Sequence, residues 1–382
     1  MDIVWFAEIK WDYLKTRKQQ IIHRKPGDIR LLYLEPYVKG RRNRFSVRRE
    51  GDIFCATVPF IKSVPSGMGR IALDQPIFRY AVDRVARFEV ARLIAKLGFD
   101  RDNLGKILSN IYSIRVASRT RGRFLLYDCN DAHASFPGMP SWSEIYFREA
   151  SRKADAVFAS SKALVSSVSD ARGSDAGVEY LGNGVDFARF QTGQAEPLLP
   201  ADLTKVRIIY IGALAPWVDF DSIQLLAERH PEWEIALVGP VLHGAEAEVA
   251  RLAALQNVAR SEPVAYSEVP QLLRQYHIAL IPFRYNDLTK GVNPNKLYEY
   301  LAAGLPVVTT RFSEEVRIYP DVVQAAEPGE PFVTACEAVA RSLAGDENHE
   351  ISKPAREIAR QNDWDNIAET FWQRVNKLMT AR

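Results

Sequence analysis

Short apolar runs alternate with amphipathic stretches of helical length along most of this chain. The runs are rich in β-branched residues and almost continuously apolar, as strands buried on both faces of a parallel sheet are. The runs expected to form strands are Ile3–Phe6, Arg30–Leu34, Ile53–Pro59, Lys106–Ile111, Phe124–Asp128, Ala156–Ala159, Val178–Leu181, Arg207–Ile211, Glu234–Val238, Ile278–Pro282 and Pro306–Thr309. The stretches expected to form helices include 75–97, 141–153, 220–229, 245–255 and 268–276. This alternation predicts an α/β protein with parallel sheets.

The strand–helix pattern is interrupted once, by a polar, Pro- and Gly-containing stretch at 191–203 that has no periodicity. A stretch of this kind is typical of a linker between domains. We therefore expect a first doubly wound lobe at 1–190 and a second at 204–355. Residues 356–382 are expected to form a helical tail, which could cross back to the first lobe.

Charge divides the chain at the same place. Residues 1–190 hold 32 Lys and Arg against 21 Asp and Glu, whereas the remaining residues hold 18 against 26. The densest basic stretch contains Arg41, Arg42, Arg44, Arg48 and Arg49. Such a stretch is either solvated surface or a face for anionic lipid, a diphosphate-linked acceptor or nucleic acid.

Composition excludes several classes of protein. No apolar run reaches the roughly 18 residues of a membrane-spanning helix, and the acidic residues in the first dozen do not predict a secretory signal. Three widely spaced cysteines favour a reducing compartment over a disulfide framework. The six histidines are dispersed, so no metal site is expected.

The most informative segment is Ile281–Val308, in which a strand, a polar loop, a helix and a second strand follow one another. Asn293 can cap a helix at about Pro294–Ala303, and the free N–H groups of such a helix form an anion site at the carboxyl end of a strand. Lys296 in its first turn would neutralise a diphosphate, and Glu299 three residues on could accept two sugar hydroxyls. The alternative is a surface Lys–Glu pair on an ordinary helix.

Asn293–Val308 resembles the donor-binding motif of glycosyltransferases with the GT-B fold, most closely family 4 and related bacterial polysaccharide enzymes. Further segments that resemble this family are Ala154–Leu164, Leu181–Phe190, Ile209–Leu214 and Trp233–Pro240. The resemblance implies two Rossmann-like lobes with a deep cleft between them, a sugar nucleotide, most commonly a UDP-sugar, as donor, and no metal cofactor. The donor-binding residues that it implies are Gly212, Glu262, Phe283, Arg284, Lys290, Asn293, Asn295, Lys296 and Glu299.

The chain departs from this family at two positions. Gly291 stands where retaining members usually carry the first of two glutamates, and no cation follows Gly212 in Ala213–Asp219. We expect Lys296, or else Lys290 or Arg284, to supply the missing positive charge. A similar lysine occurs in the xanthan glucuronosyltransferase family, whose members invert configuration, so both retention and inversion stay open.

The first lobe offers a candidate base in the segment Leu125–Phe136, where a strand leads into a loop bearing Asp131 and His133. Asp131 matches the base of the xanthan enzyme family, and a carboxylate or imidazole there could take the proton of an acceptor hydroxyl. The alternatives are a helix-capping aspartate and a structural histidine. On the acceptor side, Trp11 could stack on a sugar and Arg17 could meet a phosphate, unless their loop is plain surface.

These features together predict a hexosyltransferase that moves a sugar from a nucleotide diphosphate to a cell-surface glycan or exopolysaccharide. Its expected partners are a UDP-sugar, a glycan or lipid-linked acceptor and an anionic membrane surface, but no nucleic acid. The expected location is the cytoplasm, with peripheral attachment to the inner face of the cell membrane. Two alternatives remain: a nucleotide-sugar-binding protein that has lost turnover, and a sugar-nucleotide epimerase on the same scaffold.

Overall fold

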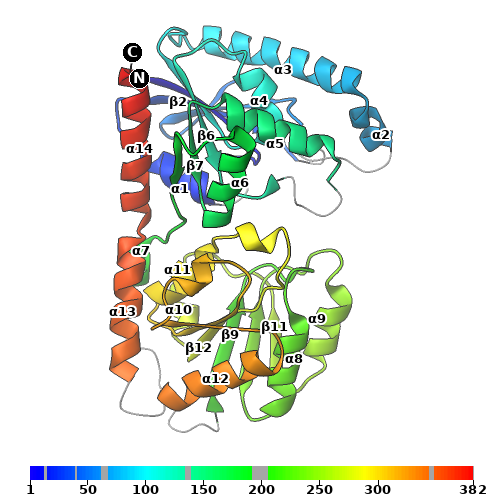
Figure 1. Ribbon diagram of the computed structural model, residues 1–382, viewed down its shortest axis with the longest axis vertical. Coiled ribbons are helices and arrows are strands. Elements are labelled where there is room, and N and C mark those ends of the chain that lie inside the picture. The colour runs from blue at the N-terminus through cyan, green and yellow to red at the C-terminus, as the bar shows by residue number, and fades with distance from the viewer. Residues whose placement is uncertain are drawn as a thin grey trace. The chain divides into compact units, whose positions relative to one another are not determined.

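The computed structural model describes residues 1–12, 15–38, 41–61, 68–133, 139–191, 205–343 and 348–381. The chain forms two compact units: unit 1 contains Met1–Gly182 and Ile367–Arg382, and unit 2 contains Asn183–Asn366. Each unit is built on one mainly parallel sheet with helices packed against it (Figure 1). Apart from Gln191, the expected linker at 191–203 lies outside the described residues.

Unit 1 has an eight-stranded sheet in the order β3-β4-β2-β1-β5-β6-β7-β8. Its strands are β1 (Asp2–Phe6), β2 (Arg30–Pro36), β3 (Arg48–Glu50), β4 (Ile53–Val58), β5 (Leu104–Leu108), β6 (Phe124–Cys129), β7 (Ala156–Ala159) and β8 (Val178–Tyr180). Its helices include α1 (Arg17–His23), α2 (Met68–Asp74), α3 (Pro76–Lys96), α4 (Ile114–Ala117), α5 (Trp142–Lys153), α6 (Lys162–Arg172) and most of α14 (Trp364–Thr380). Only β3 runs antiparallel to its neighbour.

Unit 2 has a six-stranded parallel sheet in the order β11-β10-β9-β12-β13-β14. Its strands are β9 (Arg207–Ile211), β10 (Glu234–Val238), β11 (Val258–Ser261), β12 (Ile278–Ile281), β13 (Val307–Thr310) and β14 (Val323–Ala326). Its helices include α7 (Phe187–Gln191), α8 (Phe220–Arg229), α9 (Glu246–Ala253), α10 (Val269–Leu273), α11 (Asn295–Ala302), α12 (Glu330–Leu343) and α13 (Asn348–Gln361).

The strand order of each sheet reverses once. In unit 1 the chain builds outward from β1 through β2 and β4 and then returns to place β5 on the other side of β1. In unit 2 it builds from β9 to β10 and β11 and then places β12 on the other side of β9. Ligands of open α/β sheets bind beyond the carboxyl ends of the strands at such switch points. Each unit therefore presents one expected binding edge.

The structure contains every strand that the apolar runs predict, with ends displaced by at most three residues. It adds three strands that the runs do not predict: β3, β11 and β14. All three lie at the edge of a sheet, where one side of the strand is unpaired and few side chains are buried. Polar edge strands such as Arg48-Arg49-Glu50 lack the apolar pattern by which a central strand is recognised.

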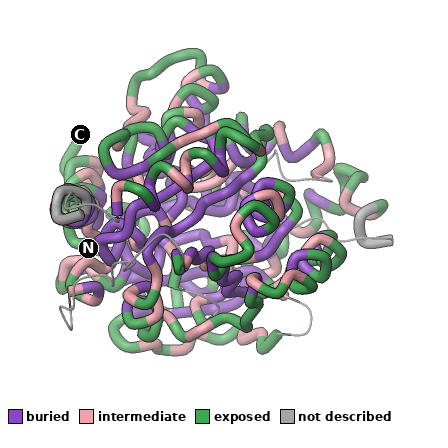
Figure 2. Tube along the Cα trace, turned by 90° about the horizontal axis from the view of Figure 1, so that it is seen from below, coloured by how far each residue is buried: buried purple, intermediate pink, exposed green. Residues whose placement is uncertain are grey.

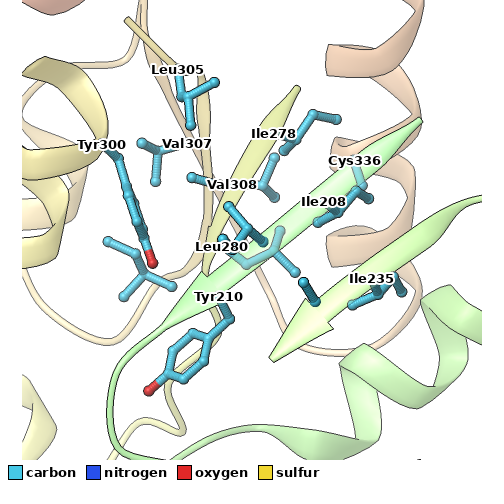
Figure 3. Packing of buried hydrophobic residues seen from close by; sticks show 14 of the residues in the cluster. Ile208, Tyr210, Ile235, Ile278, Leu280, Tyr300, Leu305, Val307, Val308 and Cys336 are labelled. Carbon is cyan, nitrogen blue, oxygen red and sulfur yellow. The ribbon is translucent and has the colours of Figure 1, made fainter. Parts of the chain in front are cut away.

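The buried residues of each unit follow its strands, while the exposed residues lie mostly on the outer helices and loops (Figure 2). In unit 2, Ile208, Ile235 and Leu280 pack among the strands, and Tyr300 reaches from α11 toward β9 (Figure 3). The Tyr300 hydroxyl accepts a hydrogen bond from the backbone N–H of Ile211 at 2.8 Å. This bond fixes α11 against the strand that leads into the expected binding edge.

Residues Ile367–Arg382 belong to unit 1 although they follow unit 2 in the chain. In α14, Phe371 stacks on Trp5 of β1 with ring centroids 5.5 Å apart. The Trp372 indole N–H donates to the carbonyl of Ile21 in α1 at 3.0 Å. Across the described residues, no helix is both long enough and apolar enough to span a bilayer.

Candidate functional site

The binding edge of unit 2 begins at a glycine turn. Strand β9 ends at Ile211, and Gly212 follows with φ +147°, a conformation that favours glycine. A Cβ atom on Gly212 would collide with Nζ of Lys296. A Cβ atom on Gly239, which follows β10 with φ +150°, would collide with the carbonyl of Gly212. The absence of a side chain at Gly212 therefore leaves the room that the Lys296 amine occupies, and Gly239 lets the Gly212 turn approach β10 closely.

Lys296 lies in the first turn of α11, and its amine sits over aromatic rings rather than beside a carboxylate. Nζ donates to the Tyr210 hydroxyl at 3.1 Å and lies 4.2 Å from the centroid of that ring. It also lies 4.8 Å from the ring centroid of Phe283, the buried residue that comes just after β12. Because the Tyr210 hydroxyl donates to the Ala213 carbonyl at 2.8 Å, the ring is held in place under the amine.

Burial lowers the pKa of Lys296 to about 7, although the charge of Glu299 opposes this shift. Burial also raises the pKa of the Glu299 carboxyl, against the opposing effects of Lys296 and a hydrogen bond with Tyr266. Within the described part of the chain, Lys296 forms no ion pair within 4 Å. A cation without a counter-ion, at a helix start and over a glycine turn, can bind an anion such as a diphosphate.

Tyr266 extends this group and was not expected from the sequence. Its hydroxyl is hydrogen-bonded to Glu299. The Arg189 guanidinium lies over the Tyr266 ring, 5.2 Å from its centroid, and forms an ion pair with Asp186 at 3.2 Å. Asp186 and Arg189 belong to the Leu181–Phe190 segment, so that motif is linked to Glu299 through Tyr266. Tyr266 lies outside the recognised motifs and carries no signal of its own.

The start of α11 differs from the expectation. Pro294, with φ −79° and ψ 121°, is the N-cap residue, and the helix begins at Asn295 rather than Pro294. Asn293, the expected cap, instead lies one residue earlier, where its carbonyl accepts a hydrogen bond from Asn183 at 2.8 Å. Because Pro294 is itself extended, it cannot be the first helical residue, and Asn293 therefore lies one position too early to cap the helix. The buried Oδ1 of Asn295 has no hydrogen-bond partner among the described residues.

Three of the expected donor residues lie in surface ion pairs. Glu262 pairs with Arg260 at 2.7 Å, Arg284 pairs with Asp221 at 3.2 Å, and Lys290 pairs with Asp287 at 2.6 Å. No described hydrogen bond or ion pair joins any of them to Lys296. Each already has a nearby opposite charge, so Lys296 remains the best-placed cation for a diphosphate in unit 2. The structure thus brings Gly212, Phe283, Lys296 and Glu299 together.

The binding edge of unit 1 carries a second polar group. Glu8 follows β1, Asp131 and His133 follow β6, and Lys18 reaches in from α1. Lys18 forms an ion pair with Glu8, and the Asn130 amide donates to Glu8 Oε1 at 3.4 Å. Glu8 and Lys18 were not expected here. The one sequence feature that pointed to this edge is that both residues lie between the first and second predicted strands.

The pKa values of the Asp131 and Glu8 carboxyls are shifted in opposite directions. Burial raises the pKa of Asp131, and Glu8 adds to the effect, while His133 and Lys18 oppose it. Burial also acts to raise the pKa of Glu8, but Lys18 and His133 outweigh it and hold that pKa below its ordinary value. When the pKa values of two neighbouring carboxyls are separated in this way, one commonly acts as a base and the other stays ionised as a fixed charge. Asp131 is therefore the better proton acceptor, and Glu8 the better permanent anion.

His133 lies beside Asp131, with its backbone N–H donating to the Asp131 carbonyl at 2.9 Å. Its buried Nε2 has no hydrogen-bond partner among the described residues. The imidazole is thus within electrostatic range of both Asp131 and Glu8. No group of three or more His, Cys, Asp or Glu side chains in the described ranges is placed to hold a metal ion.

Arg17 and Trp11 are packed into unit 1 rather than held out on a loop. Arg17 starts α1, is 3% exposed and donates through Nε to Asp128 Oδ1 at 3.0 Å. The Asp128 carboxylate thus neutralises the guanidinium in the ligand-free protein, and the acceptor contact expected of Arg17 stays a prediction. The Trp11 ring lies 5.1 Å from that of Tyr33 and 5.2 Å from that of His23.

The basic stretch at Arg41–Arg49 is likewise partly structural. Arg48 on β3 binds Glu35 at 3.0 Å and Glu50 at 2.8 Å and is mostly buried. Its guanidinium therefore cannot join a surface for lipid or acceptor. Arg42 and Arg44 are at least partly exposed in the loop before β3.

The sequence of unit 2 is similar to that of a known family. Residues 205–344 match the family model described as glycosyl transferases group 1. The matched residues lie within unit 2 and make up less than half of the chain. They include Gly212, Phe283, Lys296, Glu299 and Tyr266.

One curated relative is TuaH of Bacillus subtilis (strain 168), whose name assigns it to teichuronic acid biosynthesis as a glycosyltransferase. It is 31% identical over 193 residues, which make up 49% of this chain and 48% of the relative. The matched region thus spans about half the length of that relative.

Solved structures resemble the whole chain. Sucrose-phosphate synthase from Thermosynechococcus elongatus superposes with a TM-score of 0.74 at 14% identity, covering 100% of this chain and 99% of its own. The E. coli trehalose-6-phosphate structure with bound UDP-2-fluoro glucose gives 0.72 at 12% identity, with 100% of both chains covered. Anabaena HepE in complex with UDP gives 0.65 at 17% identity, with 99% and 100% covered. These likenesses confirm the predicted GT-B fold, and the family-model match supports the resemblance to glycosyltransferases.

Proposed function

We propose that the protein is a glycosyltransferase that transfers a sugar from a UDP-sugar to a growing cell-surface polysaccharide. The observation that carries the proposal is the Lys296 amine, which lies over the Gly212 turn at the switch point of the unit 2 sheet. The residues that match the family model include this site, and UDP is bound in the similar HepE structure. The link to TuaH supports a polysaccharide acceptor.

In the proposed donor complex, Lys296 neutralises the diphosphate and Glu299 accepts hydrogen bonds from sugar or ribose hydroxyls. Binding of the diphosphate would favour the protonated amine, because an adjacent anion raises a lysine pKa that burial has lowered. Tyr266 holds the Glu299 carboxylate in place. Asn295, at the first position of the helix, has an amide oxygen that could accept a further hydrogen bond from the donor.

In the proposed acceptor complex, Asp131 of unit 1 takes the proton from the attacking hydroxyl. Its raised pKa brings the carboxyl closer to the pKa that a general base needs. Glu8, held ionised by Lys18, would place a fixed negative charge beside Asp131 and His133. The acceptor is proposed to be a glycan or a lipid-linked glycan, and the protein is proposed to act in the cytoplasm at the membrane surface. No metal takes part in the proposed reaction.

The test is a panel of UDP, GDP, UDP-glucose and UDP-glucuronate, measured first by thermal stabilisation and then by release of the nucleotide. Ligand binding raises apparent stability by RT ln(1 + [L]/Kd), so a specific donor stands out from the other nucleotides. We expect stabilisation by UDP compounds and slow UDP release without an acceptor. Binding without any release or transfer would instead assign a nucleotide-sugar-binding protein. Interconversion of the free sugar nucleotide would assign an epimerase.

A further inference from the structure

Helix α3 of unit 1 exposes several large apolar side chains on the side that faces away from its sheet. Its inner side is made by Arg79, Asp83, Ala86, Val90, Leu93 and Ile94, which are buried. The outer side carries large apolar residues that are 52% to 68% exposed, namely Ile77, Phe78, Tyr80, Val85 and Phe88, here called the α3 outer face. At 100° per residue these side chains fall on one side of the helix. Figure 1 shows α3 along the outer edge of unit 1.

This concentration differs from the scattered apolar residues that any protein surface carries. Of the 13 large hydrophobic side chains found exposed in the described part of the chain, five form the α3 outer face and a sixth, Ile71, lies on the adjoining α2. A helix in solution normally turns polar residues outward. Exposed Arg84 and Arg92 lie between these side chains around the helix, so this side of α3 combines large apolar side chains with cations. So many exposed apolar side chains on one helix indicate a surface that is covered when the protein works.

Arginines lie within the α3 outer face and along one side of it. Five of them, Arg84, Arg87, Arg101, Arg119 and Arg121, line a cavity of about 410 Å³ together with Phe88 and Ala91. Among the described residues, Arg84, Arg87 and Arg119 form no ion pair, whereas Arg121 pairs with Asp102 at 2.5 Å. Unneutralised guanidinium groups around an apolar cavity wall can bind phosphate groups.

The other side of the α3 outer face continues into the basic loop before β3. Arg92 of α3 donates to the backbone carbonyl of Phe45 at 3.2 Å, and Phe45 itself is 46% exposed. Arg42 and Arg44 lie in the same loop. The apolar face is thus bordered by cations on both sides.

We propose that the α3 outer face docks unit 1 on an anionic phospholipid surface. The apolar side chains would enter the boundary between head groups and acyl chains, and the arginines would bind lipid phosphates. A second copy of this chain fits less well, because a two-fold contact would bring the same arginines against each other. This docking surface rests on the proposed function, because a lipid-linked acceptor is what would bring the enzyme to a membrane. It makes α3, rather than Arg41–Arg49 alone, the part of unit 1 that contacts the membrane.

The test is co-flotation of the full chain with vesicles of phosphatidylcholine alone or mixed with phosphatidylglycerol, without donor or acceptor. We expect binding that requires phosphatidylglycerol and weakens with added salt. The double variant Ile77→Ser/Phe88→Ser should lower the partition coefficient about tenfold or more, because two large side chains no longer enter the bilayer. The matched control is Ile145→Ser on α5, which removes an isoleucine that is 49% exposed and lies outside the face. It should bind as the wild type does.

A second variant, Arg84→Gln/Arg87→Gln, should weaken binding to anionic vesicles and flatten its dependence on salt. Unchanged binding of the Ile77→Ser/Phe88→Ser variant would overturn the proposal, as would equal binding to both kinds of vesicle or none to either. If the protein binds neither kind of vesicle but forms a dimer, and the Ile77→Ser/Phe88→Ser variant dissociates that dimer, the face binds a second copy of the chain instead. UDP binding is measured separately, so a failure of docking leaves the proposed donor site standing, and the reverse also holds.

Discussion

In the proposed donor site, Lys296 would stabilise a bound diphosphate, whereas its buried charge destabilises the empty protein. Replacing it should therefore change stability and binding in opposite directions. Burial holds its pKa at about 7, whereas an ordinary lysine titrates at 10.5. A lysine whose pKa is lower in the folded than in the unfolded protein lowers the free energy of unfolding at every pH at which the unfolded chain still binds the proton. This loss of stability is therefore complete below pH 7 and disappears as the pH rises from 7 toward 10.5.

At pH 7 this difference in pKa corresponds to at most about 4 kcal/mol of lost stability. Because Lys296 keeps some contact with solvent, we expect Lys296→Met to raise the free energy of unfolding by about 1–3 kcal/mol. The same substitution removes a charge-assisted contact with the diphosphate. It should weaken UDP binding by about 1.5–3 kcal/mol, or roughly 10- to 150-fold in Kd.

Urea unfolding of the ligand-free protein and calorimetric titration with UDP measure the two effects. In the wild type, UDP affinity should fall up to about 50-fold between pH 7 and pH 9, as free Lys296 loses its proton. This window lies above the pKa of about 6 for a terminal phosphate, so the ligand's own titration contributes little. The Lys296→Met variant should show no such dependence.

The matched control is Lys290→Met, which removes an exposed lysine of the same segment that already pairs with Asp287. It should leave both UDP affinity and its pH profile unchanged. The reasoning is refuted if Lys296→Met is less stable than the wild type without ligand, or if it binds UDP with unchanged affinity and pH dependence.

Three further substitutions test the other contacts. Asp131→Asn should leave UDP affinity unchanged and slow transfer by about 10²- to 10⁴-fold; transfer within a few-fold of the wild-type rate would place the base elsewhere. Arg17→Ala should destabilise the protein by about 3–5 kcal/mol in urea unfolding, because it leaves Asp128 buried without its partner; a loss below 1 kcal/mol would contradict this. Tyr266→Phe should weaken UDP-sugar binding by about 0.5–1.5 kcal/mol through a less well-positioned Glu299, with unfolding unchanged; an equal loss of stability would indicate a structural role instead.

The sequence predicts the central strands well because burial on both faces imposes a continuous apolar run on each of them. Edge strands are not predicted because burial constrains their sequences less, as the polar residues Arg48–Glu50 of β3 illustrate. Helix α1 is not predicted for a different reason. Its sequence Arg-Lys-Gln-Gln reads as surface, yet these side chains are buried. A signal was present in Thr16 and Gln19, whose spacing fits a capping box, with Gln19 Oε1 accepting from the Thr16 backbone N–H at 3.1 Å.

The candidate site follows the same division. Gly212, Lys296 and Glu299 could be predicted because each lies in a motif at the end of a strand or the start of a helix. The partners of the unit 1 site could not, since Glu8 and Asp131 are brought together only by the order of strands in the sheet. Tyr266 shows the same limit, because nothing near it in the chain indicates a contact with Glu299.

The return of α14 to unit 1 has a consequence for how the chain folds during synthesis. Unit 2 is one continuous segment, whereas unit 1 needs both Met1–Gly182 and Ile367–Arg382. The ring of Trp5 therefore waits for Phe371 until the whole of unit 2 has been made, a delay of about 10–40 s at 5–20 residues per second. During that interval the apolar surface beneath α14, which includes Trp5 and Phe158, is open to chaperones and to aggregation. The ribosome thus finishes unit 1 last, although it begins unit 1 first.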